Sequence, residues 1–401
     1  MPSPVLRPRL ALWLVSFLGA LLVGLSACQD PSNVGIGLID DERSNPNLRV
    51  VNADSVFTVS STLRTGGFTA DGTPVQTRFL AGRVVDPVLG NARATAYIDV
   101  RLPPGTQRIP EGSLIEFAEL YLVRDYVYGD TLATTPLEVR EVTTQWTPVG
   151  LPADTVLATG PLLATAQLRA RGDTTLVIPL PDSWVAERDS VLQSPNVSSL
   201  FEGFELRTPA GASGAVVGFN ARSSALRLRV VGDTTVYSYP LAEVYTALSR
   251  DAPATPPPGV VLVRQGAPEA LGFTFDLEPL RGIPLARATL RFSLDRSAVP
   301  SAGSFVRPLA TEALLVGVRE DDSRLTLGQV TIPASGDGAT LPSLQFTTTL
   351  QGQLLGQAPF KRYELSLPAS PLSLDVLPVV RAVRPDAAPP RLVLTVVGQQ
   401  T

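Results

Sequence analysis

Short segments with alternating or β-branched side chains recur along most of the chain. They cover residues 55–62, 77–85, 92–102, 114–124, 137–143 and 176–180. Each segment ends at glycine, proline, aspartate or asparagine. Alternation with a period of two places one row of side chains against a core and the other toward solvent. Such segments, spaced by turn residues, are typical of β-sandwiches and jelly rolls, so the pattern predicts an all-β protein.

Helical periodicity is confined to two short stretches. Residues 182–193 begin after Pro181, a frequent position for proline at a helix start. Residues 241–248 are a second candidate. One face of the first helix would carry Trp184, Val185, Arg188, Val191 and Leu192. Both helices are short, so we expect connectors packed on a sheet.

Two pairs of segments resemble each other across the chain. Residues 116–122 match 285–292, and residues 224–231 match 390–397. Each half of the chain therefore begins and ends its core with similar strands, as expected of an internal repeat. The alternative is that alternating strands resemble one another by composition alone.

The predicted organisation is two tandem β-sandwich, jelly-roll-like domains. Residues 48–235 form the first and residues 259–401 the second. Residues 236–258 connect them, with the proline-rich stretch 252–258 as the linker. Residues 28–47 are polar and contain an acidic cluster, which indicates a tether in front of the body.

The beginning of the chain has the order of a secretory signal. Arg7 and Arg9 precede an apolar run over residues 10–25. This run is shorter than the roughly 20 residues that a membrane-spanning helix needs. We therefore predict that residues 1–27 are a signal peptide that is removed on export.

The residues around the cleavage site match a bacterial lipobox. Leu25, Ser26 and Ala27 precede Cys28, whose thiol would carry a diacylglycerol thioether. Several acyl chains hold a protein durably at a membrane. Gln29 follows in place of an aspartate, which favours the outer membrane, on its periplasmic or its surface face. The alternative is an ordinary cleavage site beside a cysteine.

Composition narrows the chemistry of the mature chain. It has no histidine, and Cys28 is the only cysteine in 401 residues. An intramolecular disulfide, His-ligated metals and Ser-His or Cys-His catalysis are excluded. We expect neither a cofactor nor a metal. Removal of Arg7 and Arg9 leaves 31 basic against 37 acidic residues, so nucleic acid is not an expected partner.

Several motifs resemble a family of Bacteroidota envelope lipoproteins known as domain of unknown function 4270. They lie at residues 34–42, 51–57, 80–90 and 126–133. A wider likeness extends to jelly-roll modules of the carbohydrate-binding type. The resemblance implies an envelope location and a β-sandwich fold. It implies no activity, because the family has none assigned.

The most distinctive local motif is Asp86-Pro87-x-x-Gly90. Proline fixes φ and glycine permits positive φ, so the motif predicts a tight turn between strands. The Asp86 carboxylate would cap backbone amides of this turn. A ligand-binding role for Asp86 is the alternative.

Other candidate side chains have weaker patterns. Tyr121, Tyr126 and Tyr128 are close enough in sequence to form a sugar-stacking surface, or to be core residues. The acidic run 320–322 predicts a solvated turn, with a calcium site as the alternative. Lys361, the sole lysine, is expected at a solvated strand edge.

These observations predict a non-catalytic, lipid-anchored envelope protein that binds or scaffolds a partner. One alternative is a surface protein that binds glycans or degrades them with carboxylates. Another is a subunit of an envelope protein assembly. The expected partners are the membrane, through the N-terminal lipid, and a glycan or an envelope protein.

Overall fold

The structure is a computed structural model that describes residues 47–60, 76–103, 105–251, 257–265, 269–368, 370–384 and 387–397. The predicted signal peptide, the lipobox and Cys28 lie outside these residues. Among the described residues, strand accounts for 49% and helix for 10%, so the prediction of an all-β protein is confirmed. Within the described ranges, no helix combines the length and apolar character that a membrane span requires.

Strands dominate both halves of the chain. The first half contains β1 (Leu48–Asn52), β2 (Ser55–Ser60), β3 (Arg78–Val84), β4 (Ala92–Val100), β5 (Ile115–Asp130), β6 (Thr134–Val142), β7 (Thr159–Arg169), β8 (Thr175–Pro179), β9 (Phe204–Arg207), β10 (Ala215–Asn220), β11 (Ala225–Val230) and β12 (Tyr237–Arg250). The second half contains β13 (Val260–Arg264), β14 (Glu269–Thr274), β15 (Leu285–Ser293), β16 (Phe305–Val306), β17 (Glu312–Val318), β18 (Arg324–Thr331), β19 (Gly338–Pro342), β20 (Arg362–Ser366), β21 (Val376–Val380) and β22 (Arg391–Val396). The helices are α2 (Asp182–Gln193), α3 (Val197–Leu200), α4 (Leu344–Leu354), η1 (Glu278–Leu280) and η2 (Arg296–Ala298).

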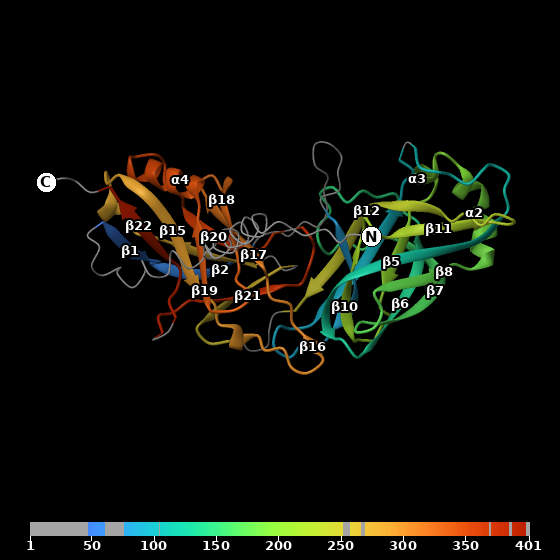
Figure 1. The fold of residues 1–401 in the computed structure, drawn as a ribbon, viewed down its shortest axis with the longest axis horizontal. Helices are drawn as coiled ribbons and strands as arrows, with labels where there is room; N and C mark the ends of the chain where they lie inside the picture. Colours follow the sequence, from blue (N-terminus) through green and yellow to red (C-terminus); the bar gives the residue numbers. More distant parts are fainter. Residues whose placement is uncertain are drawn as a thin grey trace, which may run out of the picture.

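Two β-sandwich bodies lie side by side along the long axis of the molecule (Figure 1). In the first body the strand order is β12-β11-β5-β10-β3-β4-β9-β6-β7, with β8 beside β5. Two long strands belong to both layers. The first part of β5 pairs with β11 and its last part with β10, while β12 pairs first with β11 and then with β4. The layers therefore join through strands that switch sheets.

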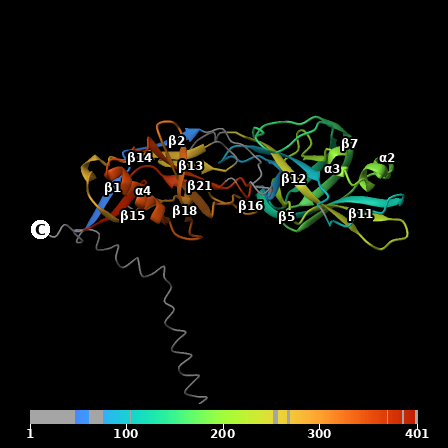
Figure 2. The same cartoon turned by 90° about the horizontal axis from the view of Figure 1, so that it is seen from above.

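The second body packs a sheet β1-β22-β15-β19 against a sheet β18-β17-β20-β14-β13-β21, with β2 beside β14. Buried leucines from both sheets, among them Leu271, Leu290, Leu365 and Leu394, form its core. Helix α4 packs against β15, where the Thr347 hydroxyl accepts a hydrogen bond from the backbone N–H of Ala288 at 3.0 Å. Figure 2 shows β16 reaching from this half of the chain to β5 of the first body.

The two bodies contain the same three-stranded unit followed by a helix. In the first, β5 lies between β11 and β8, and α2 follows; in the second, β15 lies between β22 and β19, and α4 follows. Leu120 of β5 lies opposite Leu226, and Leu290 of β15 lies opposite Leu392. These are the segments whose sequences match, so the internal repeat extends to the register of strand pairing.

The opposing layers repeat in the same way. The pairings β10–β3, β3–β4, β4–β9, β9–β6 and β6–β7 of the first body correspond to β21–β13, β13–β14, β14–β20, β20–β17 and β17–β18 of the second. Glu205 lies opposite Tyr97 in the first body, and Glu364 lies opposite Gly272 in the second. Each body is therefore one copy of a single topology.

The last strand of each copy comes from a different part of the chain. In the first body β12, which follows β11, pairs with β11 and β4. In the second body β1 pairs with β22 and β2 pairs with β14. The registers correspond, because Tyr245 lies opposite Tyr97 and Phe57 lies opposite Gly272. The N-terminal strands thus complete the C-terminal body.

This arrangement differs from the predicted boundaries. Residues 48–60, predicted in the first domain, pair with strands of the second body. Residues 237–250 of the predicted connector form β12, so the predicted helix over 241–248 is wrong. Residues 243–248 are buried throughout the strand. A strand covered on both faces loses its alternation and can mimic a helical pattern.

The other predicted helix is confirmed over its full length. Helix α2 spans Asp182–Gln193 and buries Trp184, Val185 and Leu192. Arg188 is only partly buried, and its guanidinium forms an ion pair with Glu141 at 2.6 Å. The helix is therefore a connector packed on the first body, as its length indicated.

Candidate functional site

The Asp86-Pro87-x-x-Gly90 motif forms the turn between β3 and β4. The Asp86 Oδ1 atom accepts hydrogen bonds from the backbone N–H of Val88 at 2.7 Å and of Leu89 at 3.1 Å. Gly90 has a φ of +81° and donates its N–H to the Asp86 carbonyl at 3.0 Å. The predicted tight turn with a capping carboxylate is confirmed.

The same carboxylate joins the two bodies. The Arg307 guanidinium donates to both Asp86 oxygens, at 2.8 and 2.9 Å, and the Tyr128 hydroxyl donates at 2.6 Å. Asp86 is 2% exposed and Arg307 is 7% exposed. Burial disfavours the charged carboxylate, but the hydrogen bonds from Arg307 and Tyr128 outweigh it and lower the pKa of Asp86 below its usual value. Asp86 is thus fully engaged in the protein.

Apolar and polar contacts extend this junction on both sides of Asp86. Buried side chains of the first body, including Leu80, Val84 and Leu248, form one cluster with Leu262 and Leu374 of the second. Strand β16 adds a short antiparallel pairing with the end of β5. A continuous apolar cluster with a buried bidentate ion pair holds two surfaces in one orientation. The two bodies therefore form one fixed unit.

Two of the three tyrosines considered for sugar stacking belong to the junction. The Tyr126 hydroxyl accepts a hydrogen bond from the Leu374 N–H at 2.9 Å, and burial raises its pKa. Tyr128 is fully buried beside Asp86. Tyr121 lies on the first body beneath the Arg227 guanidinium, 3.3 Å from its ring centre. These tyrosines do not form an open stacking surface: Tyr126 and Tyr128 belong to the junction, and Arg227 covers the partly buried ring of Tyr121.

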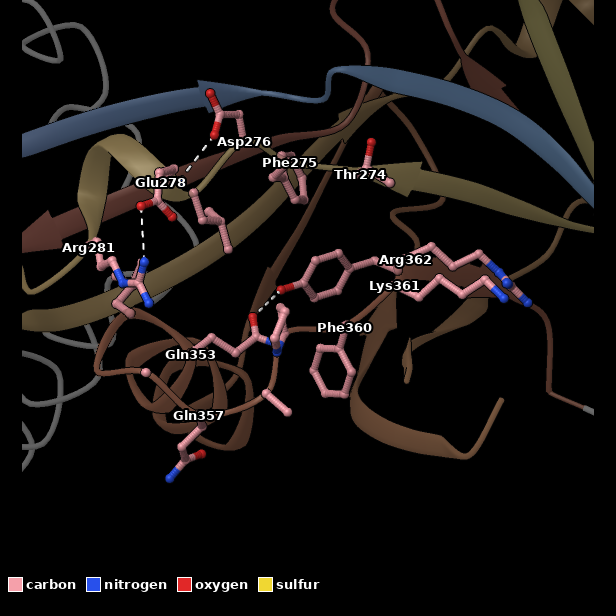
Figure 3. Close-up of a pocket in the computed structure, with 16 residues that line it drawn as sticks. Thr274, Phe275, Asp276, Glu278, Arg281, Gln353, Gln357, Phe360, Lys361 and Arg362 are labelled. Atoms are coloured by element: carbon pink, nitrogen blue, oxygen red, sulfur yellow. Dashed lines mark hydrogen bonds and ion pairs between the residues drawn. The ribbon is translucent and has the colours of Figure 1, made fainter. Parts of the chain in front are cut away.

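A cavity of about 540 Å³ lies in the second body, where η1, the end of α4 and the start of β20 meet (Figure 3). Its lining comes from connections that are far apart in sequence, over residues 274–281 and 353–363. The volume falls in the range of small-molecule sites, about 300–1,000 Å³. We therefore regard this cavity as the candidate functional site.

Aromatic rings form one wall of the cavity. Tyr363 is 3% exposed, and its ring stacks on Phe273 with a centroid distance of 6.0 Å. Phe275 and Phe360 line the cavity, and the centroids of their rings lie 5.6 and 5.5 Å from the centroid of the Tyr363 ring. Behind them, Phe346 meets Tyr363 edge to face at 6.1 Å. The core of the second body thus holds these rings in place.

Gln353, at the end of α4, supplies a polar group beside this wall. Its Oε1 atom accepts a hydrogen bond from the Tyr363 hydroxyl at 2.8 Å, drawn as a dashed line in Figure 3. Its Nε2 atom is buried and has no partner among the described residues. Burial raises the pKa of Tyr363 well above its usual value, so the phenol stays protonated. The Gln353 amide therefore leaves one donor unpaired in the wall of the cavity.

Charged side chains surround the aromatic wall on two sides (Figure 3). On one side Glu278 forms an ion pair with Arg281 at 3.1 Å, and Asp276 accepts the Glu278 N–H at 3.1 Å. On the other side lie Lys361 and Arg362. Ring faces, an amide donor and charged rims suit a small polar molecule with one apolar face, such as a sugar ring.

The first body has a cavity at the corresponding position. It lies between the loop before β5 and the end of α2, with a volume of about 890 Å³. Arg108, Glu111, Asp189 and Gln193 are among its lining residues, and no aromatic residue lines it. Gln193 spans the two segments, accepting the Gly112 N–H at 2.6 Å and donating to the Ser113 carbonyl at 2.8 Å. The repeat thus reproduces the cavity but not its aromatic wall.

The acidic run 320–322 forms the predicted solvated turn between β17 and β18. Asp322 has a φ of +59°, and its carboxylate pairs with Lys361 at 3.4 Å. Lys361 is exposed just before β20, as predicted, but β20 pairs with β14 on one side and β17 on the other, so the predicted strand edge is wrong. No group of three or more carboxylates within the described residues has an arrangement that could hold a metal ion.

Comparisons with known proteins give little more. No family model matches the chain, and no curated protein matches it. Among solved structures, the chain is similar to a presumed secreted protein of Parabacteroides distasonis ATCC 8503, at 8% sequence identity and a TM-score of 0.18, covering 85% of this chain and 98% of the other. A likeness at that TM-score carries no argument about fold or role. Membership of the family that the N-terminal motifs resemble stays a prediction.

The cavity residues were missed from the sequence for a physical reason. Phe275 lies just after β14, two positions beyond the core residue Phe273, and alternate aromatic residues at a strand end are equally typical of a core. No local sequence pattern predicts a role for Gln353, because its hydrogen-bond partner Tyr363 lies beyond the turn that follows α4. Only the folded connections bring the aromatic wall and the amide together.

Proposed function

We propose that the protein is a non-catalytic lipoprotein of the cell envelope, anchored to the outer membrane through Cys28. Its two fixed β bodies would present binding sites outside the membrane. The observation that carries this proposal is the run Leu25-Ser26-Ala27-Cys28 behind a basic and apolar segment. Asn47 accepts a hydrogen bond from the Val396 N–H at 2.8 Å, and β1 pairs with β22, so the strand nearest to Cys28 in sequence among the described residues belongs to the second body. In Figure 1, β1 and β22 lie at one end of the molecule, with the first body at the other.

The anchor can be tested by metabolic labelling with an alkyne palmitate. The wild-type protein should incorporate the label and partition with outer membranes. Cys28→Ala should lose both, and Ser26→Ala is the matched control, because alanine is also small enough for the cleavage site. Undiminished labelling of Cys28→Ala would overturn the anchor.

The cavity of the second body favours glycan binding as its role. Phe275 and Phe360 are partly buried rings that line the cavity, and Tyr363 and the unpaired Gln353 amide lie behind them in its wall. Sugars are bound by such a combination of stacking and hydrogen bonds. Asp276 and Glu278 already have partners in the protein, which does not favour a carboxylate pair for hydrolysis.

A glycan array with the purified protein tests this role. Binding without product formation is the expected result, and Phe360→Ala should weaken it about tenfold through the loss of ring contact. The matched control is Phe117→Ala on the first body, where Arg229 covers the ring. Products that disappear in Glu278→Gln would instead favour a glycan-degrading enzyme. A protein that copurifies after crosslinking, without glycan binding, would favour an assembly subunit.

A further inference from the structure

Two arginines lie side by side on the first body. The β3–β4 ladder places Arg83 directly opposite Arg93, and the β4–β12 ladder places Arg93 opposite Ser249. Residues directly opposite each other on antiparallel strands point to the same face, with Cβ atoms about 4.5–5.5 Å apart. Arg83, Arg93 and Ser249 therefore form a row across three neighbouring strands.

Neither arginine has an acidic partner within the described part of the chain. Other arginines of the protein are paired, for example Arg78 with Asp125 at 2.7 Å and Arg264 with Glu269 at 2.6 Å. Like charges directly opposite each other in a sheet are destabilising. In a protein with net charge −4, this local excess of positive charge is distinctive.

A groove of about 290 Å³ lies over this row. Its lining includes Asn91 and Asp251 in addition to the three residues of the row. The Asn91 Nδ2 atom donates to Asp251 at 3.0 Å, and the Asp251 N–H donates to the Asn91 carbonyl at 2.8 Å. The groove thus combines two guanidinium groups with a fixed amide, a hydroxyl and one carboxylate that already has a partner.

We propose that this groove binds an oxyanion, namely the phosphate or carboxylate group of a small molecule or of a sugar. Guanidinium groups bind both anions through paired N–H donors, and such charge-assisted hydrogen bonds are strong. Arg83 and Arg93 hold the anionic group, which relieves their mutual repulsion. Ser249, Asn91 and Asp251 lie where neighbouring hydroxyl groups would be bound. This site is independent of the lipid anchor and of the aromatic cavity.

The test uses thermal unfolding of the purified protein at constant ionic strength. Inorganic phosphate should raise the melting temperature relative to chloride, because a ligand that binds only the folded state stabilises it. Glucuronate should act in the same way, and glucose, which lacks the carboxylate, should not. Arg93→Gln should weaken the phosphate effect at least about tenfold in apparent affinity, by removing charge-assisted contacts.

Two further measurements keep the result unambiguous. Without phosphate, Arg93→Gln should melt at the same temperature as the wild type or higher, because one of two opposed charges is removed. Arg222→Gln, an exposed arginine on the turn after β10, should keep the full phosphate effect. An equal phosphate effect in the wild type and Arg93→Gln would overturn the proposal, as would an equal loss in Arg222→Gln.

Discussion

The two bodies have the same strand pairing but different aromatic residues at corresponding positions. In the first body Tyr97 stacks on Tyr245 with a centroid distance of 5.8 Å. In the second, Gly272 stands at the position of Tyr97, and the Phe57 ring covers it so closely that a Cβ would lie 2.5 Å from the ring. The same strand pairing therefore accommodates two stacked rings in the first body and one ring over a glycine in the second.

The next pair on the same face of these strands, two positions along, differs in charge between the bodies. Asp99 lies opposite Glu243 in the first body, while Thr274 lies opposite Ser55 in the second. The two hydroxyls share a hydrogen bond of 2.8 Å. Burial, and to a lesser degree the nearby charge of Glu243, raises the pKa of Asp99 to about 7. The first body thus contains a titratable pair where the second has a neutral one.

Connections account for most of the remaining difference. Residues 143–158 join β6 to β7 and cover the Tyr97–Tyr245 pair, with the Trp146 ring 6.5 Å from each tyrosine ring. The corresponding connection between β17 and β18 is the short acidic turn over residues 319–323. The ladders are thus common to both copies, while loops and paired positions give each body its own chemistry.

The largest expected effect comes from deleting residues 48–60. The second body would lose β1 and β2, which complete its two sheets, whereas the first body contains its own β12. Amides of β14 and β22 should lose their protection in hydrogen exchange, and those of β4 and β11 should keep it. Deletion of residues 29–46 is the control and should change neither set. Equal loss of protection in both bodies would contradict the assignment of β1 and β2.

Arg307→Ala tests the joint between the bodies. It leaves the Asp86 carboxylate buried without its cation, which typically costs about 3–5 kcal/mol. Urea unfolding near neutral pH should show this loss of unfolding free energy. Arg281→Ala, which removes one partner of an exposed ion pair with Glu278, should cost about 0–1 kcal/mol. Because the pKa of Asp86 is lowered in the folded state, its contribution is present above its usual pKa and is lost as pH falls through the lowered value. At acidic pH, the difference in free energy of unfolding between the wild type and Arg307→Ala should therefore become smaller.

Asp99→Asn tests the charged pair. An acid whose folded pKa is raised destabilises the protein increasingly as pH rises from its unfolded value, 3.8, to about 7. The variant should gain up to about 4 kcal/mol over the wild type at pH 8 and nothing near pH 4, since one pKa unit corresponds to about 1.4 kcal/mol. Thr274→Val, at the corresponding neutral position, should show no such pH dependence. A constant difference between pH 4 and pH 8 would argue against titration of Asp99.

Leu120→Ala and Leu290→Ala test the equivalence of the two cores. Both leucines are fully buried at corresponding positions of β5 and β15. Each substitution should cost about 3 kcal/mol, within the range for buried leucines. Denaturant unfolding measures both, and the difference should stay below about 1 kcal/mol. A much larger loss at one site would show that the copies differ in how well their cores relax.

Local sequence patterns predicted helix α2 and several strands of the first body, but not β7, β9 or β10, and they predicted few strands of the second body. Helix α2 and those strands follow from periodicity and turn residues, because these depend on neighbours in the chain. The matching segments around Leu120 and Leu290 predicted the repeat, since a core strand needs the same alternation in each copy.

Long-range pairing could not be predicted in this way. Asp86 and Arg307 are 221 positions apart, and no local pattern links them. Strands β2 and β14 are separated in sequence by all the strands of the first body. From the sequence alone, β2 is therefore grouped with the first-body strands that follow it. The cavity is likewise made by connections, whose conformations depend on the strands that they join.

The pairing of β1 with β22 also determines how the protein would bear mechanical load. Tension applied at Asn47 and directed along the axis of β1 would act on this strand. Its five residue pairs with β22, from Leu48–Thr395 to Asn52–Arg391, would be loaded in shear and would share the force. Unzipping would require a pull across the strands. A chain held from its N-terminal side is thus connected to its C-terminal body by the strand geometry that resists extension best.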